Sequence, residues 1–241
     1  MKRSLLCCLL ALCLLLLCVP KTFAAGTSPQ PPPKPPSRKE LEETYRKTEL
    51  PYTDLDSDEL RCVVAWLELN DIWMNRSALI PEGTTLLLPI LNVRGTRTEF
   101  YVMLWKTCGK EEVKPYPIPG IDPQNEAGKA LSWAYRKGLL SPKGKYENRA
   151  YIERLEIALC LYKLAGSPYN KNLKNLPKDV KSLKPNEQQA VMWAIEKNII
   201  ELSSDNLFHP TGQKGYCTRK DCATFLYRFY LLRVDEKTSP G

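Results

Sequence analysis

The sequence predicts an all-α fold of three helix–loop–helix repeats with little or no sheet. The main observation is a helix-opening motif that occurs three times, at residues 96–106, 153–163 and 218–228. Each copy has Arg in second place, an acid in fourth, Leu in ninth, an aromatic residue in tenth and a base in last. Repeated units of this size bury a core only by packing on one another, so they favour a binding or scaffolding protein.

An earlier helix with a Trp precedes each motif, and its end is predicted by a second repeated pattern. Five residues after each Trp comes a residue type that readily takes the left-handed conformation, and an aliphatic residue follows it. The three series are Trp66-Asp71-Ile72, Trp133-Gly138-Leu139 and Trp193-Asn198-Ile199. This pattern predicts a Schellman ending, in which the aliphatic residue contacts the residue five positions before it.

The second helix of each repeat is predicted to begin at the opening motif. Thr96 with Glu99, and Thr218 with Asp221, have the spacing of a capping box, whereas the middle copy has Glu153 in place of the Thr. A loop of variable length joins the two helices of each repeat. The first loop carries an extra apolar stretch, residues 86–91, for which a short strand or packing against a neighbour are both open.

The N-terminal segments are predicted to lie outside the repeats. Lys2 and Arg3 precede an apolar run at residues 5–19, which is typical of a secretory signal peptide ending near residue 24. No later segment reaches the length of a membrane span, so we expect none after cleavage. Residues 25–49 are predicted to be a Pro-rich linker, in which residues 25–37, with six prolines, form an extended spacer.

Composition excludes some functional classes. Lys2, Arg3 and Lys21 leave with the leader, which lowers the formal net charge from +8 to +5. This mild, dispersed charge lacks the basic clusters of a nucleic-acid-binding protein. With one histidine, His209, and scattered cysteines, the sequence shows no metal-binding spacing. We therefore expect no enzyme, no metal, no cofactor and no nucleic-acid partner.

Five cysteines remain after the leader, which is an odd number for an exported chain. Cys217 and Cys222 flank a helix start, and Cys62 and Cys108 lie at helix ends that antiparallel packing would bring together. We treat these two pairs as disulfide candidates, with five reduced and packed thiols as the alternative. Cys160 falls on an apolar stripe and is expected to be a buried free thiol.

These repeats resemble the S-layer homology family, whose second helix typically opens with a Thr-Arg-Ala-Glu-like signature. Residues 96–106 are the nearest copy, residues 218–228 the next, and residues 153–163 the most divergent. The resemblance places repeats at residues 50–111, 118–167 and 174–234, and it implies one pseudo-threefold unit with a central helical bundle.

The resemblance also implies a ligand and the residues that bind it. Members of the family anchor exported proteins non-covalently to cell-wall polysaccharide, often a pyruvylated secondary polymer of Gram-positive bacteria, in grooves between repeats. The signature Arg helps to bind the glycan acid, and the family has an acid before the first helix. The glycan-binding candidates are therefore Arg97, Arg154, Arg219, Asp54, Asp122 and Asp179.

Elementary chemistry agrees with this interpretation, because a helix N-terminus and a guanidinium both attract a carboxylate. We expect Arg97 and Arg219 to make the main contacts, with Trp73, Tyr146 and Tyr216 available to stack on sugars. The alternative for each Arg is an ion pair that only stabilises the turn.

The predicted function is that of a secreted, monomeric, cell-wall-binding protein of a Gram-positive bacterium. The alternative is a module of the same fold that has lost its glycan and binds another surface protein.

Overall fold

The computed structural model describes residues 35–140, 146, 150–169 and 173–238, and the structural statements below concern this part of the chain. The chain divides into two units, residues 1–35 and 36–241, and all helices named here belong to the second. The predicted signal peptide, residues 1–24, lies outside the described residues. No helix in the described part is both long enough and apolar enough to cross a bilayer.

The all-α prediction is confirmed. The first helices of the predicted repeats are α3 (Asp58–Leu69), α7 (Glu126–Arg136) and α9 (Pro185–Glu196), and the second helices are α6 (Arg97–Thr107), α8 (Arg154–Leu164) and α10 (Arg219–Thr238). The connecting segments contain the short helices α4 (Arg76–Leu79), α5 (Leu88–Leu91) and the 3-10 turn η1 (Leu173–Asn175). The apolar stretch at residues 86–91 thus forms α5, which packs against α10, and not a strand.

The three predicted helix endings all form as expected. Asp71, Gly138 and Asn198 have positive φ angles of 50°, 65° and 53°. The next residue then donates its backbone N–H to the carbonyl five positions back, at 3.0 Å for Ile72 to Leu67, 2.8 Å for Leu139 to Ala134 and 2.9 Å for Ile199 to Ala194. This is the six-to-one hydrogen bond of the Schellman motif, so the stop signals read from the sequence are confirmed.

The predicted caps of the second helices also form. Thr96 and Glu99 make a reciprocal capping box at the start of α6. Thr218 and Asp221 exchange the corresponding hydrogen bonds at α10, at 2.8 and 3.1 Å. Glu153 gives α8 no side-chain cap, and instead its Oε1 accepts a hydrogen bond from Gly212 N at 2.9 Å.

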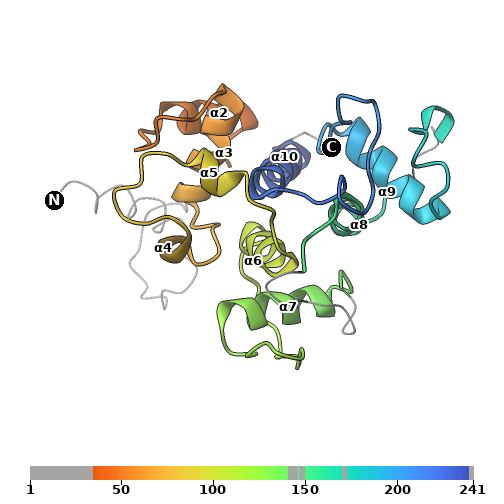
Figure 1. Cartoon of the computed structure of the whole chain (residues 1–241), viewed down its shortest axis with the longest axis horizontal. Coiled ribbons are helices and arrows are strands. Elements are labelled where there is room, and N and C mark those ends of the chain that lie inside the picture. Colours follow the sequence, from red (N-terminus) through yellow and green to blue (C-terminus); the bar gives the residue numbers. More distant parts are fainter. Residues whose placement is uncertain (1–34, 141–145, 147–149, 170–172, 239–241) are drawn as a thin grey trace, which may run out of the picture. The chain divides into compact units, whose positions relative to one another are not determined.

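The helices pair across the boundaries of the predicted repeats. α6 packs against α7, α8 against α9, and α10 returns to α3, so that each second helix is covered by the first helix of the next repeat. The second helices α6, α8 and α10 form the inner group of this unit, and α3, α7 and α9 lie outside them (Figure 1). The contact between α10 and α3 joins the two ends of the helical array.

Backbone hydrogen bonds also connect the three segments that lead into the inner helices. Gly95 N donates to Cys217 O at 2.9 Å, Cys217 N donates to Ile152 O at 3.1 Å, and Ile152 N donates to Gly95 O at 3.1 Å. We call these three residues the central ring. Each stands one position before the N-cap of its helix, so the ring sets the N-termini of α6, α8 and α10 beside one another.

The linker prediction was wrong for residues 38–47. These residues form the helix α2 (Arg38–Lys47), which begins at a capping box between Ser37 and Glu40. Tyr45 is buried, and its ring packs edge-on against Tyr227 of α10 with 6.0 Å between centroids. The prolines that favour an extended chain lie before α2, whereas the contact of Tyr45 with Tyr227 packs α2 on the α3–α10 pair.

Neither candidate disulfide is formed, because all five cysteines of the described chain are free thiols. Cys62 on α3 packs under Glu42 of α2, with 3.8 Å from its Sγ to the Glu42 carbonyl oxygen, while Cys108 is exposed at the end of α6. The pairing of Cys62 with Cys108 assumed that α3 and α6 pack antiparallel, whereas α3 packs on α2 and α10. Cys217 and Cys222 are both buried, with Cys217 in the central ring.

Gly128 provides a test of the packing at the start of α7. A Cβ atom on this residue would lie 2.1 Å from the Asp122 carbonyl oxygen and 2.5 Å from Pro123 Cα. Gly128→Ala should therefore lower the free energy of unfolding by about 2 kcal/mol, although alanine normally favours a helix. Urea denaturation would measure this change, and exposed Lys129→Ala is the matched control, expected to stay within about 0.5 kcal/mol of the parent. An unchanged or raised stability for Gly128→Ala would contradict the packing.

Candidate ligand-binding site at the second-helix N-termini

The three signature arginines occupy equivalent places at the first residue of each inner helix. Their backbone N–H groups donate to neighbouring segments in a repeated pattern, Arg97 to Ala150 O at 2.8 Å, Arg154 to Gly215 O at 2.9 Å and Arg219 to Val93 O at 2.9 Å. The structure thus brings these sequence-predicted residues together around the central ring. Their side chains, however, have different partners.

Arg97 and Arg219 form ion pairs with acids of other repeats. Arg97 Nε lies 2.7 Å from Glu156 Oε2, and Arg219 Nη2 lies 2.7 Å from Glu99 Oε1. Both acids are the fourth residue of the same motif in a neighbouring copy. Arg219 and Glu99 are largely buried, with side-chain exposures of 18% and 10%. The ion-pair alternative considered for each Arg is therefore the observed arrangement at these two positions.

Arg154 has no carboxylate partner among the described residues. Its Nε donates to the Phe208 carbonyl oxygen at 2.6 Å, and its Nη2 donates to the Glu201 carbonyl oxygen. The guanidinium carbon lies 5.0 Å from the centroid of the Phe208 ring and 5.7 Å from that of Phe225. The Glu201 carboxylate is 3.0 Å from Arg228 instead. Arg154 is thus a partly buried cation whose direct contacts are carbonyl oxygens and aromatic faces, while the carboxylates of Asp221, Asp179 and Glu201 act on it from further away.

The electrostatic consequence differs between the two kinds of arginine. Burial disfavours the charged form of Arg97, but the hydrogen bond and the charge of Glu156 outweigh it and raise the pKa of Arg97. Burial dominates at Arg154 and lowers the pKa of that guanidinium below its usual value. A buried cation without a counter-ion gains more from an added anion than a paired one does. Of the three signature arginines, Arg154 is therefore the one that makes no ion pair with a described carboxylate, and it stands in the most divergent motif.

The predicted acidic residues hold the loops of their own repeats. Asp54 accepts hydrogen bonds from Leu87 N and Leu88 N at 2.8 and 2.7 Å, and Asp179 accepts from Phe208 N and His209 N at 3.2 and 2.7 Å. The Asp122 carboxylate accepts from Gln124 N, two residues away, at 2.9 Å. The loop residues 141–145 and 147–149 of the middle repeat lie outside the described residues. Asp54 and Asp179 thus fix the backbone that precedes the inner helices.

Two of the three aromatic residues expected to stack on sugars are buried. Trp73 is 1% exposed and Tyr146 is 6% exposed, so neither ring can present a face to a ligand. Burial also raises the pKa of the Tyr146 hydroxyl to about 12. Tyr216 is half-buried and keeps part of its surface.

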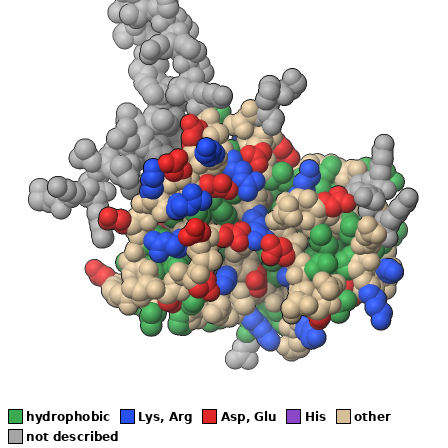
Figure 2. Space-filling model, turned by 90° about the horizontal axis from the view of Figure 1, so that it is seen from above, with side chains coloured by type: hydrophobic (Ala, Val, Ile, Leu, Met, Phe, Trp, Pro, Cys, Tyr) green, Lys and Arg blue, Asp and Glu red, His purple; other side chains and the backbone are tan. Residues whose placement is uncertain are grey.

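A cavity lies beside Arg154, between the start of α3 and the first turns of α10. Two residues that Arg154 contacts, Glu201 and Phe225, line it together with Ser57, Glu59, Lys220 and Arg228. Arg228 pairs with Glu59 at 2.7 Å as well as with Glu201. Acidic and basic side chains are likewise interspersed on the face in Figure 2, which shows no extended patch of one sign. Any anion recognised here is selected by local geometry more than by a long-range field.

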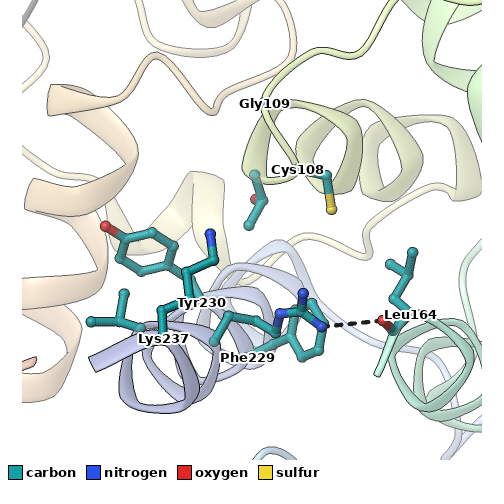
Figure 3. A pocket seen from close by; sticks show the side chains of 9 residues that line it. Cys108, Gly109, Leu164, Phe229, Tyr230 and Lys237 are labelled. Carbon is teal, nitrogen blue, oxygen red and sulfur yellow. Dashed lines mark hydrogen bonds between the residues drawn. The ribbon is translucent and has the colours of Figure 1, made fainter. Parts of the chain in front are cut away.

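A second pocket lies at the C-terminal ends of α6 and α8, and sequence reasoning did not anticipate it. Figure 3 shows its walls, which include Cys108, Phe229, Tyr230 and Lys237. Arg233 Nη1 donates to the Leu164 carbonyl oxygen at 3.3 Å, at the end of α8. Residues of α10 after position 228 form part of its wall, because α10 is longer than α6 and α8. The sequence signal for this pocket was the continuation of the helical pattern beyond the third motif. It contains none of the predicted ligand-binding residues.

The segment that supplies the carbonyl oxygens bound by Arg154 is also the part of the chain that resembles a known family. Residues 178–213 match the S-layer homology domain. None of the curated proteins matches the chain. The matched segment spans α9 and the following loop, and it supplies Asp179, Glu201 and Phe208. The S-layer homology segment therefore contributes both carbonyl oxygens that bind the Arg154 guanidinium.

The described residues offer no group of three metal-ligating side chains. His209 Nε2 lies 2.9 Å from Asp205 Oδ2, four residues earlier in the same loop of the S-layer homology segment. Its backbone N–H binds Asp179, so His209 contributes to the loop that Asp179 fixes.

The Arg219–Glu99 pair should contribute measurably to stability. Arg219→Ala leaves the Glu99 carboxylate largely buried without its partner, and we expect the free energy of unfolding to fall by about 2–3 kcal/mol. The double variant Arg219→Ala/Glu99→Gln should recover part of this loss, because no unpaired charge remains. Urea denaturation of both single variants and the double variant gives the coupling energy. Strictly additive losses would show that the pair contributes no interaction of its own.

Proposed function

We propose that this protein binds an anionic cell-wall polysaccharide non-covalently at the cell surface, and that Arg154 supplies the main charged contact. Support comes from the match of residues 178–213 to the S-layer homology domain and from the two carbonyl oxygens, of Glu201 and Phe208, by which that segment holds the Arg154 guanidinium. The single observation that carries the proposal is a partly buried guanidinium with no carboxylate partner among the described residues.

The chemistry of this site suits a carboxylate on a sugar. The carboxylate would complete the hydrogen bonding of the guanidinium, whose Nε and Nη2 already bind carbonyl oxygens. The start of α8, at Arg154, adds the positive end of a helix dipole. The neighbouring cavity between α3 and α10 gives room for the rest of the glycan. A pyruvylated sugar meets these requirements, and so does any other sugar that carries an accessible carboxylate.

The proposal also covers the repeat architecture, the export and the oligomeric state of the chain. The chain would be three S-layer homology repeats in one pseudo-threefold unit, with no catalytic role, exported by a Gram-positive bacterium and monomeric. The cyclic hydrogen bonds of the central ring and the equivalent contacts of the three arginine backbones support three related repeats. Ligand binding is then unequal among them, because Arg97 and Arg219 are already neutralised by Glu156 and Glu99.

Those two ion pairs also favour a second candidate function. A module with this fold could have replaced its glycan acids by internal carboxylates and now bind another surface protein. The two functions differ in the role of Arg154, because only glycan binding requires its guanidinium to contact a carboxylate of the ligand.

Arg154→Gln should weaken binding to purified cell walls about tenfold or more, because it removes a charge-assisted contact. Co-sedimentation at increasing protein concentration measures the affinity. Arg136→Gln is the matched control, since Arg136 is an exposed arginine near the end of α7, and it should bind as the parent does.

A parallel measurement separates the two functions. Walls stripped of secondary polysaccharide should no longer bind the parent protein. Binding that survives both the stripping and Arg154→Gln would exclude the glycan function and favour a protein partner.

A further inference from the structure

Three residues that the proposed site does not use come together around the central ring. Arg94, Tyr151 and Tyr216 each stand two positions before an N-cap, at Thr96, Glu153 and Thr218. Isolated β-bridges pair Arg94 with Thr218, Tyr151 with Thr96 and Tyr216 with Glu153. The side chains of three separate segments are thereby brought to one place by a repeated backbone pattern. We call these three residues the Arg94 cluster.

The geometry of the Arg94 cluster is that of a cation beside two aromatic faces. The Arg94 guanidinium carbon lies 5.4 Å from the centroid of the Tyr151 ring and 5.0 Å from that of Tyr216. The two tyrosine rings meet edge-on, with 5.5 Å between centroids and an interplanar angle of 61°. Arg94 is exposed and both tyrosines are half-buried, so part of each side chain faces solvent.

The polar groups of the cluster make few hydrogen bonds within the described chain. Arg94 Nη2 donates to Gln213 Oε1 at 2.7 Å, and Arg94 makes no ion pair with any described residue. Within the described chain, neither the Tyr151 nor the Tyr216 hydroxyl forms a hydrogen bond. The helices α6, α8 and α10 each begin three residues after a member of the cluster, so the positive ends of their dipoles lie near it. Among the carboxylates next to those turns, Glu99 and Glu156 bind Arg219 and Arg97, Asp221 binds Thr218, and Glu153 accepts a hydrogen bond from Gly212 N.

We propose that the Arg94 cluster is a second binding site, which takes a carboxylated sugar residue with its carboxylate on Arg94 and its C–H face on a tyrosine ring. Tyrosine offers an apolar face with a polar edge, which suits the two surfaces of a pyranose. The guanidinium provides a planar fork for a carboxylate. The central ring holds all three backbones, so little ordering is needed when the ligand binds. This proposal rests on the proposed function for its ligand class, but it uses none of the residues around Arg154.

Nuclear magnetic resonance on the ¹⁵N-labelled chain tests the two sites separately, through the Nε–Hε signals of Arg94 and Arg154. Glucuronic acid, glucose and acetate are the probes. We expect a saturable shift of the Arg94 signal with glucuronic acid, a weaker response to acetate and none to glucose. Arg94→Gln should weaken glucuronic acid binding at the cluster, followed on the backbone amides of residues 151 and 216, about tenfold or more, while the Arg154 signal still responds.

The tyrosines are tested with two double variants. Tyr151→Leu/Tyr216→Leu should weaken glucuronic acid binding about fivefold through the loss of the aromatic faces. Tyr151→Phe/Tyr216→Phe keeps those faces and the packing, and it should bind within about twofold of the parent.

Several results would overturn the second site. A silent Arg94 signal beside a responding Arg154 signal would exclude the cluster and leave the proposed function intact. A responding Arg94 signal beside a silent Arg154 signal would instead support the cluster and exclude Arg154 as the site of the proposed function. Equal affinity for acetate and glucuronic acid would show an anion site without sugar recognition, and an equal response to glucose would show that the carboxylate has no role.

Discussion

The structure depends on the closure of a helical array by backbone hydrogen bonds and by the contact of α10 with α3. Each inner helix is covered by the outer helix of the next repeat, so the first outer helix and the last inner helix would both lack a partner in an open chain. Their pairing completes the core, and α2 covers the junction with Tyr45. At the other end of the inner helices, the central ring joins Gly95, Ile152 and Cys217. Because helix N-termini expose unpaired N–H groups, three of them can be brought together only when caps and carbonyls satisfy those groups.

The same closure explains why three equivalent arginines have different chemical roles. Their backbones are held identically, but the acid in the fourth motif position is Glu in two copies and Asp in the third. Glu99 and Glu156 reach the arginines of neighbouring repeats. Asp221 is shorter by one methylene, and its carboxylate binds Thr218. Arg154 instead donates to carbonyl oxygens of the S-layer homology segment and has no direct contact with a described carboxylate. A difference of one methylene thus leaves Arg154 without the ion pair that Arg97 and Arg219 make within the described chain.

Much of the local structure could be predicted because its causes are local. The endings at Asp71, Gly138 and Asn198 follow from residues that tolerate the left-handed conformation, and the caps at Thr96 and Thr218 follow from hydrogen bonds within one turn. The site was harder to predict. Arg97 and Arg219 looked like the best ligand contacts because their motifs are the most regular, yet Glu156 and Glu99 of neighbouring copies neutralise them. The expected stacking residues Trp73 and Tyr146 turned out to be buried in the core.

The sequence alone determined the helices, their ends and the triplicate motif, since these depend on residues within a few positions of one another. Only the tertiary structure decided which helices pair, which thiols lie apart and which arginine lacks a counter-ion. The expected contact of Cys62 with Cys108 assumed that α3 and α6 pack together, whereas α3 packs on α2 and α10, and α6 packs on α7 and α10. The Arg94 cluster has the same origin, because its three members are separated by more than fifty residues along the chain and meet only when the central ring forms.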